Sequence, residues 1–306
     1  MVLEYQDFVS KLQEEMLRLS DMEPEQLIFR PGKDGTASDC LMLDFGGKGP
    51  ARTRMAVQTR DLFEERSDGS CVTALAQSLL EQMRRIRSLG IDQKGDTFTR
   101  YDEIREHLII RPLPLTAVSS GQYVFRQIGD IALVLYLRLG MSEGNLFTSR
   151  IRRDMLSSWQ VPEVRVLEEA LENTLNLSPP RLYSLEKMIL EPGYKGDRLM
   201  DPEDGTTLAD TPCGTCLSTV SRIDGAVAPF LPGVSSRIAR LLGEDFYIAF
   251  TSVHEAMIHR VSLVTPDDLE TVLRETIEET TRGSEFLSYG IYRYYSDRGV
   301  IEPVGP

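Results

Sequence analysis

The stretch Ile131-Ala-Leu-Val-Leu-Tyr-Leu-Arg-Leu139 decides the fold, because every residue in it except Arg138 is apolar. A nearly continuous apolar stretch of this length is typical of a strand that is buried on both faces. It falls well short of the roughly 20 apolar residues that cross a membrane as a helix, and the chain has no longer run. The sequence therefore predicts a sheet with covered faces and no membrane span.

The chain before this strand alternates between helical and extended patterns. From Tyr5 to Leu19, apolar residues recur at helical spacing with charged residues between them, which indicates a helix with one buried stripe. Pro112 and Pro114 lie in an apolar run, and proline cannot donate to a neighbouring strand, so this run is expected at a sheet edge. The predicted elements are a helix at 5–19, strands at 26–30, 40–45 and 55–58, a helix at 72–89 and an edge strand at 107–115.

The chain after this strand is patterned in the same way. Asp224-Gly225 is a strong hairpin signal, so either 216–223 pairs with 226–230 or the residues after Gly225 begin a helix that runs to Leu242. Four tyrosines within 289–295 indicate either a partner-binding edge strand or a core strand. The other predicted elements are helices at 149–159, 162–175 and 266–280, and strands at 246–250, 253–261 and 291–295.

Together these elements predict an α+β fold, with a mixed or mainly antiparallel sheet covered by helices. Residues 111–122 are rich in Pro, Ser and Gly and predict a linker, so we expect two α+β subdomains, residues 1–113 and 114–306. Residues 166–174 and 272–280 share the pattern V-L-x-E-x-[L/I]-E-x-T. The shared pattern reflects either a duplicated strand-helix unit or the general likeness of acidic amphipathic helices.

The charge of the chain excludes several classes of partner. The 306 residues carry a formal net charge of -13, and a surface this negative repels the phosphates of nucleic acids and of acidic lipids. Two basic clusters, at 84–87 and 150–153, are either solvated helix faces or sites for an anion or a partner. The chain has only four cysteines and begins without a signal-peptide pattern, which favours the reducing cytoplasm.

The sharpest catalytic candidate is His254-Glu-Ala-Met-Ile-His259. It resembles the zinc-peptidase motif H-E-x-x-H with one additional residue. That chemistry needs both imidazoles on one helix face, whereas this spacing separates them by about 140° on a helix and places them on opposite faces of a strand. Ordinary strand histidines are the better interpretation, with His254 and Glu255 kept as candidates for a catalytic pair.

Cys213-Gly-Thr-Cys216 has the C-x-x-C spacing of redox and zinc sites. A zinc site needs further ligands, and Cys40 and Cys71 are isolated in the sequence. A redox pair needs a helix directly after it, where a strand is predicted. Cys213 and Cys216 are therefore interpreted as structural, with a redox or metal role as the alternative, and no motif predicts a cofactor.

Several segments together carry a family pattern, in order and in spacing. They are Tyr5-x-x-Phe8, 129–136, 168–174, Gly225-Ala, Pro232-Gly-Val, 240–248, Ser252-Val-His-Glu255 and 291–294. In these segments the chain resembles an uncharacterised family of gut Firmicutes, the domain of unknown function 5688 family. Because that family has no assigned activity, the resemblance implies no catalytic residue. His254 and Glu255 belong to its pattern, whereas His259 and the Cys213/Cys216 pair do not.

The function predicted from the sequence is that of a non-enzymatic cytoplasmic protein that binds an unidentified protein or small-molecule partner. This prediction rests on the acidic composition, on only three histidines and on the lack of a coherent nucleophile–base set in the sequence. One alternative is a hydrolase-like or other enzyme centred on His254 and Glu255. The other is a redox or metal role for Cys213 and Cys216.

Overall fold

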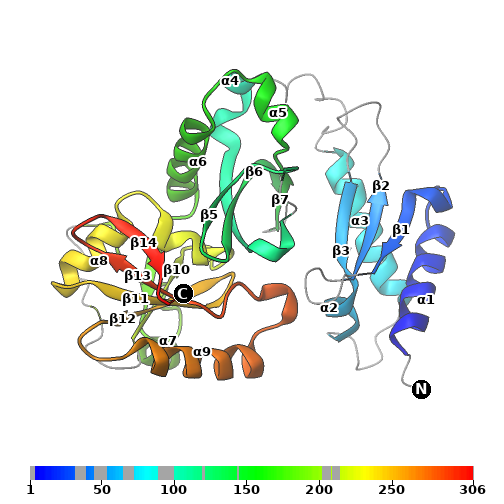
Figure 1. Cartoon of the computed structure of the whole chain (residues 1–306). Helices are drawn as coiled ribbons and strands as arrows, with labels where there is room; N and C mark the ends of the chain where they lie inside the picture. Colours follow the sequence, from blue (N-terminus) through cyan, green and yellow to red (C-terminus); the bar gives the residue numbers. More distant parts are fainter. Residues whose placement is uncertain are drawn as a thin grey trace. The chain divides into compact units, whose positions relative to one another are not determined.

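The computed structural model describes residues 4–31, 39–44, 54–64, 72–88, 100–118, 121–142, 145–201, 208 and 214–305. The chain divides into two compact units (Figure 1). Unit 1 comprises Met1–Glu103 with Leu139–Thr148, and unit 2 comprises Ile104–Arg138 with Ser149–Pro306. Helices cover antiparallel sheets, so the predicted α+β class is confirmed. The predicted division into subdomains 1–113 and 114–306 is a statement about which parts fold independently, and it stays a prediction.

Unit 1 is a three-stranded antiparallel sheet packed against helices (Figure 1). Its elements are α1 (Tyr5–Arg18), the 3-10 turn η1 (Pro24–Gln26), β1 (Leu27–Arg30), β2 (Cys40–Asp44), β3 (Arg54–Gln58), α2 (Thr59–Glu64), α3 (Val72–Ser88) and α4 (Tyr101–Ile104), whose last residue begins unit 2. The apolar stripe that the sequence predicts on α1 is buried, and it packs on α3 and the sheet. The core includes Phe8, Val9, Leu12, Met16, Leu27, Leu41, Leu43, Leu75, Leu79 and Met83.

The long apolar strand, β6 (Ile131–Ser142), pairs with three others in unit 2's smaller sheet. Residues 131–137 of β6 are all buried, as their uninterrupted apolar character predicts. Its partners are β4 (Leu108–Pro114), β5 (Phe125–Ile128) and β7 (Asn145–Arg150), whose residues up to Thr148 belong to unit 1. The short elements around them are η5 (Arg105–His107), η6 (Leu115–Ala117) and α5 (Arg153–Ser158). The end of β6, from Leu139, belongs to unit 1, where Leu139 packs on the core.

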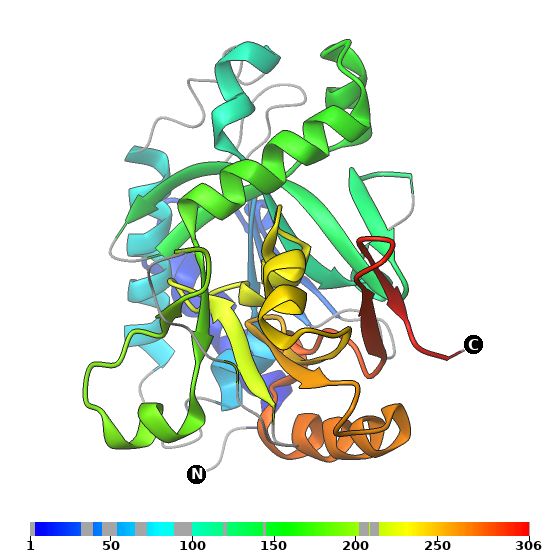
Figure 2. The same cartoon turned by 90° about the vertical axis from the view of Figure 1, so that its left-hand side faces the viewer.

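The edge position predicted for the strand with two prolines is confirmed, because β4 ends the order β4-β6-β5. Helix α6 (Glu163–Leu177) runs across this sheet (Figure 2). The Thr174 hydroxyl accepts the outward N–H of Ile110 at 2.9 Å, which satisfies a donor that has no strand partner. The backbone N–H groups of residues two apart in a strand point to the same side of that strand. The nitrogens of Pro112 and Pro114 therefore also point away from β6, where the strand needs no N–H donor. Residues 111–117 therefore build a strand and a turn, and this part of the predicted linker is wrong.

The larger sheet of unit 2 has seven strands in the order β14-β13-β11-β12-β10-β8-β9. The strands are β8 (Pro180–Tyr183), β9 (Asp197–Arg198), β10 (Thr215–Thr219), β11 (Phe246–Ser252), β12 (Glu255–Arg260), β13 (Ile291–Tyr295) and β14 (Val300–Pro303). One face packs on α9 (Pro266–Thr280), and η7 (Gly225–Phe230) packs on β10 and β12 (Figure 2). The remaining elements are α7 (Leu185–Leu190), α8 (Val234–Leu242) and η8 (Gly283–Glu285).

Two sequence interpretations of unit 2 are corrected by the structure. Of the two alternatives after Cys216, the hairpin is wrong, because β10 pairs with β8 and β12 while residues 225–230 form the 3-10 helix η7. The other alternative is closer, since η7 is followed by helix α8, which ends at Leu242. Asp224 adopts a left-handed backbone with φ 54°, which turns the chain onto the sheet rather than back along β10. The predicted helix at 149–159 is shortened to α5, because β7 continues to Arg150.

The tyrosine-rich strand is a core strand. β13 pairs with both β11 and β14, and Tyr292 and Tyr294 are buried, so β14 forms the edge instead. The two copies of the shared helix pattern lie on different strands, α6 against β4 and α9 against β11, and the duplication stays a prediction. No helix in the described ranges combines the length and apolar character that crossing a bilayer requires.

Candidate functional site

His254 occupies the turn between β11 and β12. Its backbone is held from both sides: the N–H donates to the Ser252 hydroxyl at 3.0 Å, and the carbonyl accepts from the Ser218 hydroxyl at 2.7 Å. The imidazole Nδ1 accepts the backbone N–H of Asp224 at 3.1 Å, which places the ring proton of neutral His254 on Nε2. Nε2 lies 3.7 Å from the Glu285 carboxylate, and both side chains are 34% exposed.

Glu255 begins β12 and bonds to different partners. Its carboxylate accepts from the Thr251 hydroxyl at 2.9 Å and from the Cys216 thiol at 3.6 Å. The two sequence candidates are therefore adjacent in the chain but belong to separate hydrogen-bond groups. The carboxylate that lies near His254 is that of Glu285, which the sequence analysis did not identify.

Cys216 is buried in β10. Burial and the nearby Glu255 carboxylate raise the pKa of its thiol to about 12, the opposite of the lowered pKa that a redox thiol requires. Cys213 lies outside the described residues. His259 is buried on β12, opposite Tyr247, and a Cβ at Gly214 would come within 2.7 Å of its ring. In the described ranges, no three His, Cys, Asp or Glu side chains form a group that could hold a metal ion.

The turn before η7 joins His254 to β4. The Asp224 carboxylate accepts two hydrogen bonds from the Arg111 guanidinium, at 2.6 and 3.1 Å. The next residue, Gly225, lies so close to its neighbours that a Cβ there would be 2.1 Å from the Ser218 hydroxyl and 2.3 Å from the His254 carbonyl. Only glycine fits this position without a shift of its neighbours.

Arg111 leads in turn to one of the basic clusters. The Tyr136 ring lies under the guanidinium carbon of Arg111 at 5.0 Å and under that of Arg150 at 5.9 Å, and Arg150 Nε donates to the Tyr136 hydroxyl at 2.8 Å. Arg150 also lies over the Tyr123 ring at 5.4 Å. These successive contacts define a polar strip, formed by Tyr123, Arg150, Tyr136, Arg111, Asp224, His254 and Glu285.

Sequence reasoning identified only two members of the polar strip as candidate site residues. It considered His254 as a catalytic residue and Arg150 as part of a basic cluster, whereas Arg111 was assigned to a strand and Asp224 to a turn. One signal was available, namely that Arg111 is the only charged residue of an otherwise apolar edge strand. Its partner, 113 positions further along the chain, has no such signal.

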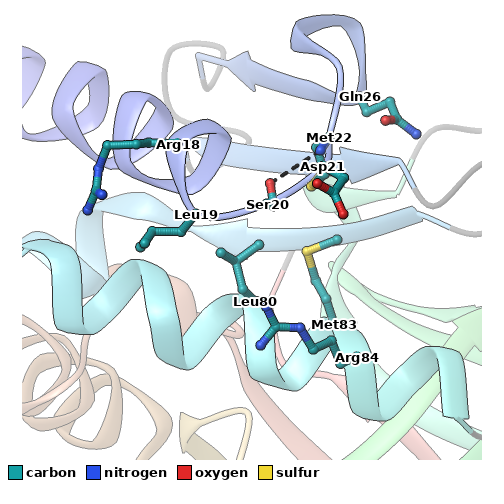
Figure 3. A pocket seen from close by; sticks show the side chains of 9 residues that line it. All are labelled: Arg18, Leu19, Ser20, Asp21, Met22, Gln26, Leu80, Met83 and Arg84. Carbon is teal, nitrogen blue, oxygen red and sulfur yellow. Dashed lines mark hydrogen bonds between the residues drawn. The ribbon is translucent and has the colours of Figure 1, made fainter.

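Unit 1 contains a pocket of about 290 Å³ between the end of α1, the segment after it and α3 (Figure 3). Leu80 and Met83 point from α3 toward the segment that follows α1 (Figure 3). Its lining residues are Arg18, Leu19, Ser20, Asp21, Met22, Gln26, Leu80, Met83 and Arg84. Neither His254 nor Glu255 belongs to this pocket, whereas Arg84 of the other basic cluster does.

The polar groups of the pocket are arranged for structure rather than for nucleophilic chemistry. The Ser20 hydroxyl donates to the Met16 carbonyl at 2.6 Å and accepts the Met22 N–H at 3.4 Å (Figure 3). Arg18 is paired with the Glu15 carboxylate at 2.7 Å. No histidine or cysteine is among the lining residues, so the serine has no histidine base beside it.

The model of a family described as "Family of unknown function (DUF5688)" matches residues 5–296. No curated protein and no solved structure matches the chain.

Proposed function

This chain belongs to the DUF5688 family, a family of unknown function, and we propose that it is a non-enzymatic cytoplasmic protein that binds a partner polypeptide through the pocket of unit 1. The observation that carries the proposal is that this pocket pairs an apolar floor with charged rims and has no nucleophile–base pair. Ligand sites are typically mostly apolar, with a few polar groups that set orientation.

The size of the pocket favours a protein partner over a bulky cofactor. At about 290 Å³, the pocket is at the lower end of the roughly 300–1,000 Å³ that is typical of small-molecule sites. One or two apolar side chains of a peptide suit such a volume. Met22 and Met83 line it, and the flexible thioether side chain of methionine adapts to different apolar partners.

The charge at the rim favours an acidic partner. Arg84 is exposed, and no carboxylate in the described part of the chain forms an ion pair with it. The partner segment proposed here carries an apolar side chain for the floor and a neighbouring Asp or Glu for Arg84.

Methionine methyl NMR tests this proposal on the full chain. The probe is a synthetic peptide with a Leu-Phe pair flanked by glutamates, and the control peptide has lysines in their place. We expect the glutamate peptide to shift the methyl resonances of Met22 and Met83, while that of Met257 in unit 2 stays unchanged. The proposal fails if neither pocket methyl responds.

A charge reversal separates specific from non-specific binding. Arg84→Glu should abolish the response to the glutamate peptide and favour the lysine peptide. The matched reversal, Arg240→Glu, lies at an exposed position of α8 in unit 2 and should change nothing. Equal effects of the two variants would contradict the role of Arg84.

An enzyme centred on His254 and Glu255 is the second candidate. One observation supports a catalytic His254, namely that its Nε2 faces the Glu285 carboxylate and is partly exposed. Glu255 is hydrogen-bonded to Thr251 and Cys216. In this enzyme hypothesis we therefore assign Glu285, rather than Glu255, as the carboxylate that acts with His254. A hydrolase substrate panel that is turned over by wild type and not by His254→Ala would favour it over the binding function.

The redox or metal proposal for Cys213 and Cys216 has less support. A thiol with a raised pKa is a poor nucleophile and a poor metal ligand, because both roles need the thiolate. Thiol titration under mild oxidation, together with elemental analysis of the purified chain, tests it. A readily formed disulfide or a stoichiometric metal would restore this role.

A further inference from the structure

Arg150 is a cation whose recorded contacts are all with uncharged groups. Its Nε donates to the Tyr136 hydroxyl at 2.8 Å, and its Nη1 donates to the Ala117 carbonyl at 3.4 Å. The other arginines of its cluster differ, because Arg152 pairs with Asp154 at 3.2 Å and Arg153 pairs with Glu163 at 2.9 Å. Within the described residues, no carboxylate lies at ion-pair distance from Arg150.

Neither carboxylate of the polar strip pairs with Arg150, because Asp224 is bonded to Arg111 and Glu285 lies beside His254. Arg111 and Asp224 neutralise each other through their two hydrogen bonds. Arg150 is only partly exposed, so water screens its charge less than it would at the open surface. A half-buried guanidinium with no counterion is costly in a structural role, and a chain of net charge -13 supplies carboxylates readily where one is needed.

The contacts of Arg150 leave one direction open for a ligand. The rings of Tyr123 and Tyr136 lie over its guanidinium at 5.4 and 5.9 Å, and Nε is occupied. The Nη2 amino group makes no recorded bond with a described residue, and Nη1 makes only the long bond to Ala117. A ligand must therefore approach in the plane of the guanidinium, along the Nη1–Nη2 edge.

We propose that Arg150, oriented by Tyr136 and Tyr123, binds the carboxylate of a small monocarboxylate ligand. A planar carboxylate accepts two parallel hydrogen bonds from a guanidinium edge, which is the geometry that remains here. A single uncompensated positive charge matches a monoanion better than a doubly charged phosphate. This site is separate from the pocket of unit 1, and it does not depend on the partner proposed for that pocket.

The test uses the full chain and propionate, titrated at constant ionic strength against chloride. Arginine Nε–Hε resonances are followed by NMR in wild type, where the Arg150 resonance is the one missing from the spectrum of Arg150→Gln. Backbone amide resonances around residue 150 follow propionate binding in wild type and in every variant. We expect propionate to shift this resonance saturably. Arg150→Gln should weaken propionate binding at least about tenfold, because it removes a bidentate charge-assisted pair.

Two further variants keep the test decisive. Arg152→Gln removes the neighbouring, already paired arginine and should bind propionate as wild type does. Tyr136→Phe removes the hydroxyl that holds Nε and should weaken binding while Arg150 is still present. If Arg150→Gln does not fold, the wild-type titration and the Tyr136→Phe variant decide the question.

Three results would overturn the proposal. The first is a folded wild-type protein whose Arg150 resonance does not respond saturably to propionate. The second is a folded Arg150→Gln or Tyr136→Phe variant that binds propionate as tightly as wild type. The third is inorganic phosphate binding at Arg150 more tightly than propionate, which would assign the site to a different class of anion.

Discussion

The Tyr292 hydroxyl, on β13, donates a hydrogen bond to the Asp130 carboxylate in the turn between β5 and β6. The same carboxylate accepts from the Ser288 hydroxyl at 2.8 and 2.9 Å, and the phenol oxygen accepts the Asp130 N–H at 3.2 Å. Burial, reinforced by the Asp130 carboxylate, raises the pKa of Tyr292 well above its ordinary range, so the phenol stays a neutral donor. This cluster ties a turn of the smaller sheet to an interior strand of the larger one.

Replacing Tyr292 with Phe should therefore destabilise unit 2. The variant removes the hydrogen bond from the buried Tyr292 hydroxyl to the exposed Asp130 carboxylate, and a hydrogen bond to a charged group contributes about 1.5–3 kcal/mol. The matched control is Tyr295→Phe, whose hydroxyl makes no recorded hydrogen bond with a described residue. Urea unfolding measures both free energies, and a Tyr292→Phe variant as stable as the control would show that the cluster contributes nothing.

Replacing Arg111 with Ala should cost about 2 kcal/mol of unfolding free energy, because Asp224 would lose its partner in a partly buried place. The two side chains are 30% and 13% exposed. Arg152→Ala breaks the pair with Asp154, in which both side chains are 64% exposed and screened by water, and should cost much less than Arg111→Ala. Thermal or chemical denaturation measures the unfolding free energies of the two variants. Equal losses of unfolding free energy would contradict the structural role of Arg111.

Replacing Gly225 with Ala should cost about 2–4 kcal/mol, because the new methyl group overlaps the Ser218 hydroxyl and the His254 carbonyl. The turn that presents Asp224 and His254 would have to move. Gly283→Ala is the control, since its Cβ meets no atom within 4 Å and its backbone suits any residue. We expect the control to be neutral or slightly stabilising by calorimetry. A mild effect at Gly225 would show that the turn yields easily.

The Cys216 thiol should make stability depend on alkaline pH. Its pKa is raised from an ordinary 9.0 to about 12 in the fold, so the native state favours the protonated thiol. The stabilising contribution is complete below the unfolded-state pKa and is lost as pH rises from about 9 toward about 12. The difference in unfolding free energy between wild type and Cys216→Ala should therefore shrink over that range.

Alkylation followed by peptide mass spectrometry gives a second measurement on the same thiol. Cys216 is buried, whereas Cys40 is partly exposed, so Cys40 should react first in the native protein. Unfolding should make their rates similar. Native Cys216 reacting as fast as Cys40 would contradict both its burial and its raised pKa.

Much of the fold follows from local patterns. The uninterrupted apolar run of β6, the two prolines of β4 and the helical spacing of α1 and α9 each depend on neighbouring residues alone. The hairpin interpretation at Asp224-Gly225 was wrong, because the same dipeptide also suits a left-handed turn onto the sheet, and packing against Ser218 and His254 decides between the two.

The candidate sites were harder to predict, because a site consists of residues that lie close together in space, and the sequence alone does not give the distances between them. From the sequence alone came the acidic balance, the doubt about the H-E-x-x-x-H spacing and the basic cluster that includes Arg150. Only the tertiary structure decided that His254 faces Glu285 rather than Glu255, and that Arg111 joins Asp224 to Tyr136 and Arg150. The physical reason is that these contacts connect strands and turns far apart in the chain. Side-chain direction and burial, which set both the partners and the pKa values, exist only after the sheets have formed.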